Sequence, residues 1–135
     1  MNERGQASVL LVGIVLLGLA FAGLAVDGTR LFTARRDLHN IADSAALAGA
    51  SALDEARFRA SDGVDVQLDP VAAHLAVDAV LRESNLPADT RVEVDVDATT
   101  IEVRLARPVD LTFLRILGAR DQTIGAHATA SPNTG

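Results

Sequence analysis

The sequence predicts an α+β protein in which a long N-terminal transmembrane helix continues into a small domain with a short antiparallel sheet of about three strands. Residues 5–26 carry no charge, helix-forming residues with a periodic apolar face follow them, and strictly alternating apolar residues appear after residue 90. We therefore expect three parts: a transmembrane anchor over 1–26, an extended alanine-rich helix over 27–60, and a small α+β domain over 61–135 that packs on that helix. The 135 residues leave room for one compact domain beside the anchor.

The N-terminal segment is long enough to cross a membrane as a helix. Residues 5–26 read GQASVLLVGIVLLGLAFAGLAV, and at about 1.5 Å per residue they match roughly 30 Å of bilayer hydrocarbon. A cleaved secretory signal is the alternative, with Ala20-Phe21-Ala22 as the nearest peptidase site, but the apolar core of such signals is usually only about 7–15 residues long. A core helix fits less well, because so small a domain could hardly surround it. We expect a single-pass membrane protein.

The helix is expected to leave the membrane without a break. No proline occurs before Pro70, and the residues from Asp27 to about Arg59 favour helix. Apolar residues recur along one side of this segment at seven-residue steps, with three more on the same face: Leu31, Leu38, Ala45 and Ala52, then Ala34, Ile41 and Ala48. A helix ending near residue 58 would be roughly 80 Å long, too long for strands of about 20 Å to cover. We therefore expect the part around Leu31 and Leu38 to stay bare and to serve as a partner surface.

A second helix is expected after a turn at residues 61–63. Asp69 is placed to cap it and Pro70 to occupy its first position, while Asn85 and Pro87 are placed to end it. Its apolar residues are spaced so that one face should be buried, consisting of Ala72, Leu75, Ala76 and Ala79.

A β-hairpin is expected next. Residues 91–97 alternate apolar with charged side chains, and the alternation resumes after a short turn. Pairing Val94 with Val103 sets the branched apolar residues on one face and places Glu93 opposite Arg104, where the two could form a cross-strand ion pair.

The end of the chain predicts a short helical turn and a third strand. Pro108 is expected to break the hairpin, Asp110 to cap the turn, and Gly118 to end it. The strand that follows carries Ile124 and the alternate alanines of 126–130 on its inward face. Such a face, made mostly of methyl groups, would let a helix pack close to the sheet.

The composition argues against several classes of function. With 18 acidic and 12 basic residues and a net charge of -6, the chain lacks the basic surface that nucleic acid requires. Cysteine is absent, and His39, His74 and His127 lack the spacing of metal ligands. No serine stands in a GxSxG or SxxK setting. We interpret the acidic residues beside the hairpin turn as a solvated edge rather than as a cation site. We expect no enzyme, cofactor, metal or small-molecule substrate.

Two pairs of residues on the first helix are candidates for assembly contacts. Asp27 and Arg30 stand one helical turn apart where the apolar stretch ends. They either form an interfacial pair that fixes the depth of the helix, or one of them meets an opposite charge on a partner's helix. Gly18 and Ala22 are small residues at four-residue spacing, a pattern typical of helix contacts in lipid.

Three local patterns carry a resemblance to a known family. Arg4-Gly5 precedes the apolar span, Asp27 to Arg30 closes it as an acid-x-x-Arg segment, and residues 42–48 read ADSAALA. In these patterns the chain resembles the N-terminal region of the TadE/TadG-like proteins of the Flp, or tight adherence, pilus-assembly system. Leu117-Gly118 and the strand end at 128–130 resemble related small proteins.

The resemblance implies a pilin-like or pseudopilin-like component that assists Flp pilus assembly or the associated secretion. It would sit in the cytoplasmic (inner) membrane with its C-terminal domain outside the cytoplasm. Its partners would be membrane lipid and other pilus-assembly or envelope membrane proteins. The alternative is a non-pilus envelope adaptor that binds a membrane partner through the alanine-rich helix.

The sequence departs from the pilin pattern at two places. Prepilin-type processing would cut between Gly5 and Gln6, but Leu10 stands where pilins carry an acid five residues into the mature chain. The arginines that follow the span outnumber Arg4, a distribution that by itself predicts a cytoplasmic C-terminus. We adopt the topology that the resemblance implies.

Overall fold

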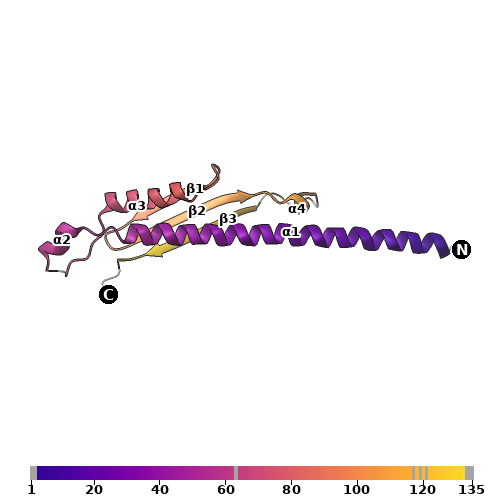
Figure 1. Ribbon diagram of the computed structural model, residues 1–135, viewed down its shortest axis with the longest axis horizontal. Helices are drawn as coiled ribbons and strands as arrows, with labels where there is room; N and C mark the ends of the chain where they lie inside the picture. Colours follow the sequence, from indigo (N-terminus) through magenta and orange to yellow (C-terminus); the bar gives the residue numbers. More distant parts are fainter. Residues whose placement is uncertain (1–2, 63, 117, 119, 121, 133–135) are drawn as a thin grey trace.

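One helix runs through the whole molecule. The structure is a computed structural model that describes residues 3–62, 64–116, 118, 120 and 122–132. Helix α1 spans Glu3–Ala50, and its N-terminal part projects beyond the other elements (Figure 1). The other elements are α2 (Glu55–Ala60), α3 (Pro70–Glu83), β1 (Arg91–Val96), β2 (Ile101–Val109), α4 (Thr112–Ile116) and β3 (Gln122–Ala130). The predicted α+β class is confirmed.

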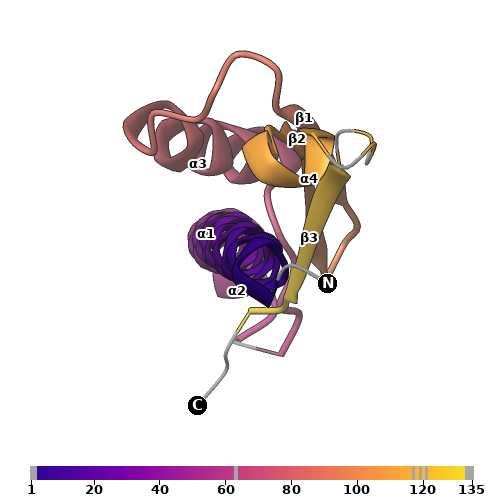
Figure 2. The ribbon, with the colours of Figure 1, turned by 90° about the vertical axis from the view of Figure 1, so that its right-hand side faces the viewer.

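The strands form one antiparallel sheet in the order β1-β2-β3. Val94 pairs with Val103 and Glu93 stands opposite Arg104, so the predicted register of the hairpin is confirmed. Strand β3 then pairs along the whole of β2. Helices α1 and α3 lie on the same face of this sheet, and the other face is open (Figure 2).

The core lies between the second half of α1 and the sheet. Leu38 and Ala45 of α1 are no more than 1% exposed, and Val103 of β2 is fully buried. Small residues let the helix approach closely: a Cβ added at Gly49 would lie 2.3 Å from the Cδ1 atom of Ile101 and 3.0 Å from a methyl group of Val77. The alanines of β3 face inward as predicted, with Ala126 and Ala128 being 6% and 7% exposed.

The long helix ends earlier than predicted. It stops at Ala50 rather than near residue 58, and the alanine-rich stretch is divided between α1 and the short α2. The physical reason is that residues 52–54 pair with residues 67–69 instead: the Asp54 N–H donates to the Gln67 carbonyl at 2.9 Å and the Asp69 N–H to the Ala52 carbonyl at 3.0 Å. The Asp54 carboxylate then accepts the backbone N–H of Arg57 at 3.0 Å and starts a new helix. The turn predicted at 61–63 ends α2, with Asp62 in the left-handed region at φ 52°. Gly63 lies outside the described residues.

Helix α3 begins as predicted but buries a different face. Asp69 caps it, accepting two backbone N–H groups, and Pro70 is its first residue. Its buried residues are Ala73 and Val77, both 0% exposed, whereas Leu75 of the predicted face is 63% exposed. The predicted face was therefore wrong by about one residue, or about 100° around the helix. The reason is tertiary packing, since a methyl group of Val77 packs against α1 at Gly49.

Strand β2 continues through the proline that was expected to break the hairpin. Pro108 pairs with Thr123 of β3, and the strand ends at Val109. The prediction was wrong because β1 reaches only as far as the pair of Arg91 with Ala106. Beyond that point one edge of β2 has no neighbouring strand, and a residue without an N–H group is tolerated there.

The apolar stripe of α1 is covered by the chain's own domain, and the expectation that its membrane-proximal part stays bare was wrong. Leu38 is 1% exposed, and Leu31 is half-buried against the core. The reason is the length of the strands, because β2 and β3 have 9 residues each. At about 3.3 Å per residue they extend about 30 Å, which matches about 20 residues of helix. The strands also run along the axis of α1 (Figure 1).

Candidate functional site

A buried carboxylate marks the point where the apolar half of α1 ends. Asp27 is 0% exposed and is the one buried charged residue among those that the structure describes. Its Oδ1 atom accepts the backbone N–H of Thr112 at 3.2 Å, and its Oδ2 atom accepts those of Phe113 and Leu114, both at 2.7 Å. These are the first amides of α4, which have no partner within their own helix. Asp27 therefore caps α4 from a distant helix.

A glycine one turn before Asp27 makes room for α4. A Cβ added at Gly23 would lie 2.4 Å from the Cδ1 atom of Phe113 and 3.0 Å from its Cβ. Any side chain at this position would displace the aromatic ring, and with it the docked turn. Glycine in a helix costs about 1 kcal/mol of stability relative to alanine. At this position glycine is needed because the Phe113 ring packs where a side chain would lie.

Arg30 completes the contact from the exposed side. Its Nη1 atom donates to the Thr112 hydroxyl at 3.3 Å. The Asp27 carboxylate is fully buried and accepts three amides within the chain, so in this structure no partner's helix can reach it. The two residues that the sequence paired are thus brought together by α4, each through a different contact. Arg30 remains exposed.

The sequence pointed to the wrong cap for α4. It predicted Asp110, whereas the cap is Asp27, which lies 85 residues from the first amide that it binds. The end of the turn was predicted correctly, since Gly118 has a φ of +88° and donates its N–H to the Arg115 carbonyl. Leu117 lies outside the described residues. The one available signal was the spacing of Gly23 and Asp27 on a single helical face.

The small pair in the apolar half of α1 faces away from α4. Gly18 and Ala22 are exposed, and a Cβ added at Gly18 would meet no atom within 4 Å. This pair lies about 100° around the helix from Leu19 and Gly23, the residues beside α4. Gln6 is exposed near the start of α1, whereas the surroundings of the Gly5 position lie outside what the structure describes.

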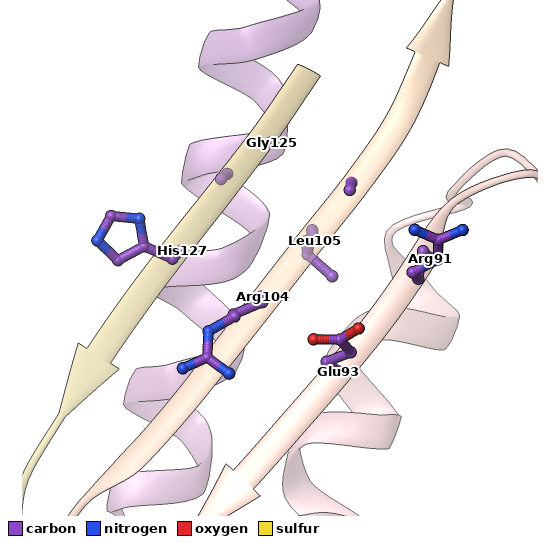
Figure 3. Close-up of a pocket in the computed structure, with 8 residues that line it drawn as sticks. Arg91, Glu93, Arg104, Leu105, Gly125 and His127 are labelled. Atoms are coloured by element: carbon purple, nitrogen blue, oxygen red, sulfur yellow. The ribbon is translucent and has the colours of Figure 1, made fainter. Parts of the chain in front are cut away.

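The open face of the sheet has a shallow hollow of about 290 Å³ (Figure 3). It is lined by the polar side chains of Arg91, Glu93, Arg104 and His127, and by the small residues Ala106 and Gly125. Arg104 contacts Glu102 of its own strand at 2.6 Å, instead of forming the predicted cross-strand pair with Glu93. The two partners remain partly exposed. Among the described residues, no group of three His, Cys, Asp or Glu side chains could hold a metal ion.

The projecting half of α1 is long and apolar enough to cross a membrane, by length and composition. Only 6% of its most apolar window is buried within the molecule, so this half is not the core helix of the domain. Apart from the α4 junction, its described side chains are exposed.

Comparison with known proteins finds a family match for the first helix. Residues 5–52 match the model of the Tad family, described as Flp pilus-assembly TadE/G-like. The match covers α1 from its third residue to just past its end and confirms the resemblance seen in the sequence. A search of curated proteins found no significant match, and a search of solved structures found none either. The matched segment includes Gly23, Asp27 and Arg30, the α1 residues described above as contacting α4.

Proposed function

We propose that this chain is a membrane-anchored, pilin-like or pseudopilin-like component that assists assembly of an Flp/Tad-type pilus or the associated secretion, and that it acts through contacts rather than catalysis. The observation that carries the proposal is the family match over residues 5–52. That segment is the helix that both projects from the domain and forms one side of its core. The match supports a role in pilus assembly, and the architecture supports the pilin-like form of that role.

The exposed apolar half of α1 supports a membrane anchor. Large side chains such as Leu10, Ile14, Leu17 and Phe21 are 58–66% exposed. Full burial of such a side chain stabilises by about 1.5–3 kcal/mol, and these residues still expose more than half of their surface. We place this half in the cytoplasmic membrane with the domain on the outer side, where the domain could meet other pilus-assembly or envelope proteins. Processing between Gly5 and Gln6 remains part of the proposal.

Within the membrane, the contact with partners is proposed to run through Gly18 and Ala22. Their face is unoccupied, and the absence of large side chains lets another helix approach closely. Leu31 and Leu38 are not part of this proposed surface, because the domain covers them. The same burial weighs against the alternative of an envelope adaptor that binds through the alanine-rich stripe.

The experiment is complementation of a gene deletion in the native host, with pili sheared from the cell surface as the readout. The wild-type gene and a Gly13→Leu variant should restore surface pili, whereas Gly18→Leu should reduce both pili and co-purification with membrane partners. The two glycines form a matched pair, since neither has an atom within 4 Å of an added Cβ. Unchanged piliation in the deletion strain would contradict the pilus role. Equal restoration by the two variants would contradict the helix contact.

A further inference from the structure

Helix α4 presents apolar side chains next to the membrane-spanning half of α1. Phe113 is 40% exposed and Ile116 is 78% exposed. Together with Leu19 and Ala20 they line a depression of about 200 Å³. All four residues are apolar, so within this depression the exposed apolar surface of α1 continues onto α4.

The position of α4 along α1 decides its depth. It packs against Gly23 and reaches Leu19, several residues inside the apolar stretch that ends at Val26. If the bilayer surface lay on the N-terminal side of Leu19, residues 6–18 would have to cross it with about 20 Å of helix. The hydrocarbon core is about 30 Å thick. A span of sufficient length must therefore include the residues on which α4 is docked.

The first amides of α4 do not depend on water as a hydrogen-bond partner. Its first three amides are bonded to the buried Asp27 carboxylate, and unpaired N–H groups would be costly in lipid. Leu111, which precedes the helix, is 2% exposed. Arg30 lies four residues beyond the last apolar residue of the span, or about 6 Å along the helix, at the level where a basic side chain can reach lipid phosphates.

We propose that α4 is a membrane-inserted foot. It lies in the interface of the leaflet through which α1 leaves the bilayer, with Phe113 and Ile116 in contact with acyl chains. This inference rests on the proposed membrane anchor and adds a second contact with lipid that fixes the depth of the domain. Lipid is the occupant because the surface of α4 is continuous with the lipid-facing surface of the span.

The test uses single cysteines in the full chain, which contains no native cysteine. An environment-sensitive fluorophore is attached to Ile116→Cys, to Leu16→Cys in the span, and to Val71→Cys near the start of α3, where the wild-type side chain is 70% exposed. Each protein is reconstituted in vesicles of phosphatidylethanolamine and phosphatidylglycerol at less than one chain per vesicle. Quenching by nitroxide-labelled lipid is compared with quenching by aqueous iodide.

We expect the label at position 116 to be quenched by nitroxide lipid and protected from iodide, like the label at position 16, while the label at position 71 shows the reverse. If position 116 behaves like position 71 while position 16 remains in lipid, the anchor stands and the foot is wrong. If position 16 is also open to iodide, the membrane anchor itself fails. Protection at position 116 that appears only at high protein density would assign the surface to a second copy and would overturn the lipid proposal.

Discussion

Replacing Asp27 by alanine should release α4 from α1 while leaving the rest of the domain folded. The substitution removes three hydrogen bonds to the amides of Thr112, Phe113 and Leu114. A bond to a charged group contributes about 1.5–3 kcal/mol, and loss of a helix cap costs about 0.5–2 kcal/mol. The three bonds are not additive, because an undocked α4 can hydrate its amides. We therefore expect a cost of about 2–3 kcal/mol for docking.

The assay is hydrogen exchange of these three amides in lipid nanodiscs. At a factor of ten for each 1.4 kcal/mol, they should exchange about 30- to 150-fold faster in Asp27→Ala. Asp27→Asn should give a smaller effect, because its one remaining carboxamide oxygen can still accept from two amides. Asp43→Ala is the matched control on an exposed position of α1. The amide of Val103, in the core, should keep its protection in all variants. Equal exchange in the variants at positions 27 and 43 would refute the capping role.

Three further outcomes follow from the same geometry. Gly23→Val should accelerate exchange in α4 because of the clash with the Phe113 ring, while Gly28→Val, where an added Cβ meets nothing within 4 Å, should not; equal acceleration would contradict the packing argument. Leu38→Arg should lower the melting temperature sharply, since burying an unpaired charge costs several kcal/mol, whereas Phe32→Arg, at a side chain that is 70% exposed, should have little effect; similar melting of both would place Leu38 outside the core. A reporter fused after Gly135 should be active only outside the cytoplasm, and activity of a cytoplasm-specific reporter would reverse the proposed topology.

The features that the sequence predicted correctly are those encoded by neighbouring residues. The register of Val94 with Val103 follows from strict alternation on both strands, because a slip of one residue would turn every apolar side chain outward. The start of α3 follows from Asp69 and Pro70, whose cap and fixed φ act within one turn. The inward alanines of β3 follow from the same period of two.

The features that it missed depend on contacts between distant segments. By local sequence, Asp110 is a suitable N-cap for α4. Nothing near α4 in the sequence indicates that a carboxylate 85 residues away accepts its first amide instead. Likewise, the two candidate faces of α3 differ little in composition, and the one that is buried is chosen by its fit to Gly49 on α1. The α1 stripe is covered because the strands are longer than expected, and β2 is longer because it continues through Pro108.

The junction at Asp27 determines how firmly the domain is joined to the projecting half of α1. The first core residue of α1 beyond it is Ala34, 9% exposed, so two helical turns separate the two contacts. Within this interval Leu31 is half-buried against the core. Without α4, the turn from Asp27 to Leu31 would be supported by helix hydrogen bonds alone. With α4 docked, α1 is held at both ends of the interval by parts of the same domain, because α4 lies between β2 and β3 in the chain. Asp27 therefore gives the apolar half of α1 a second connection to the sheet, in addition to the helix itself.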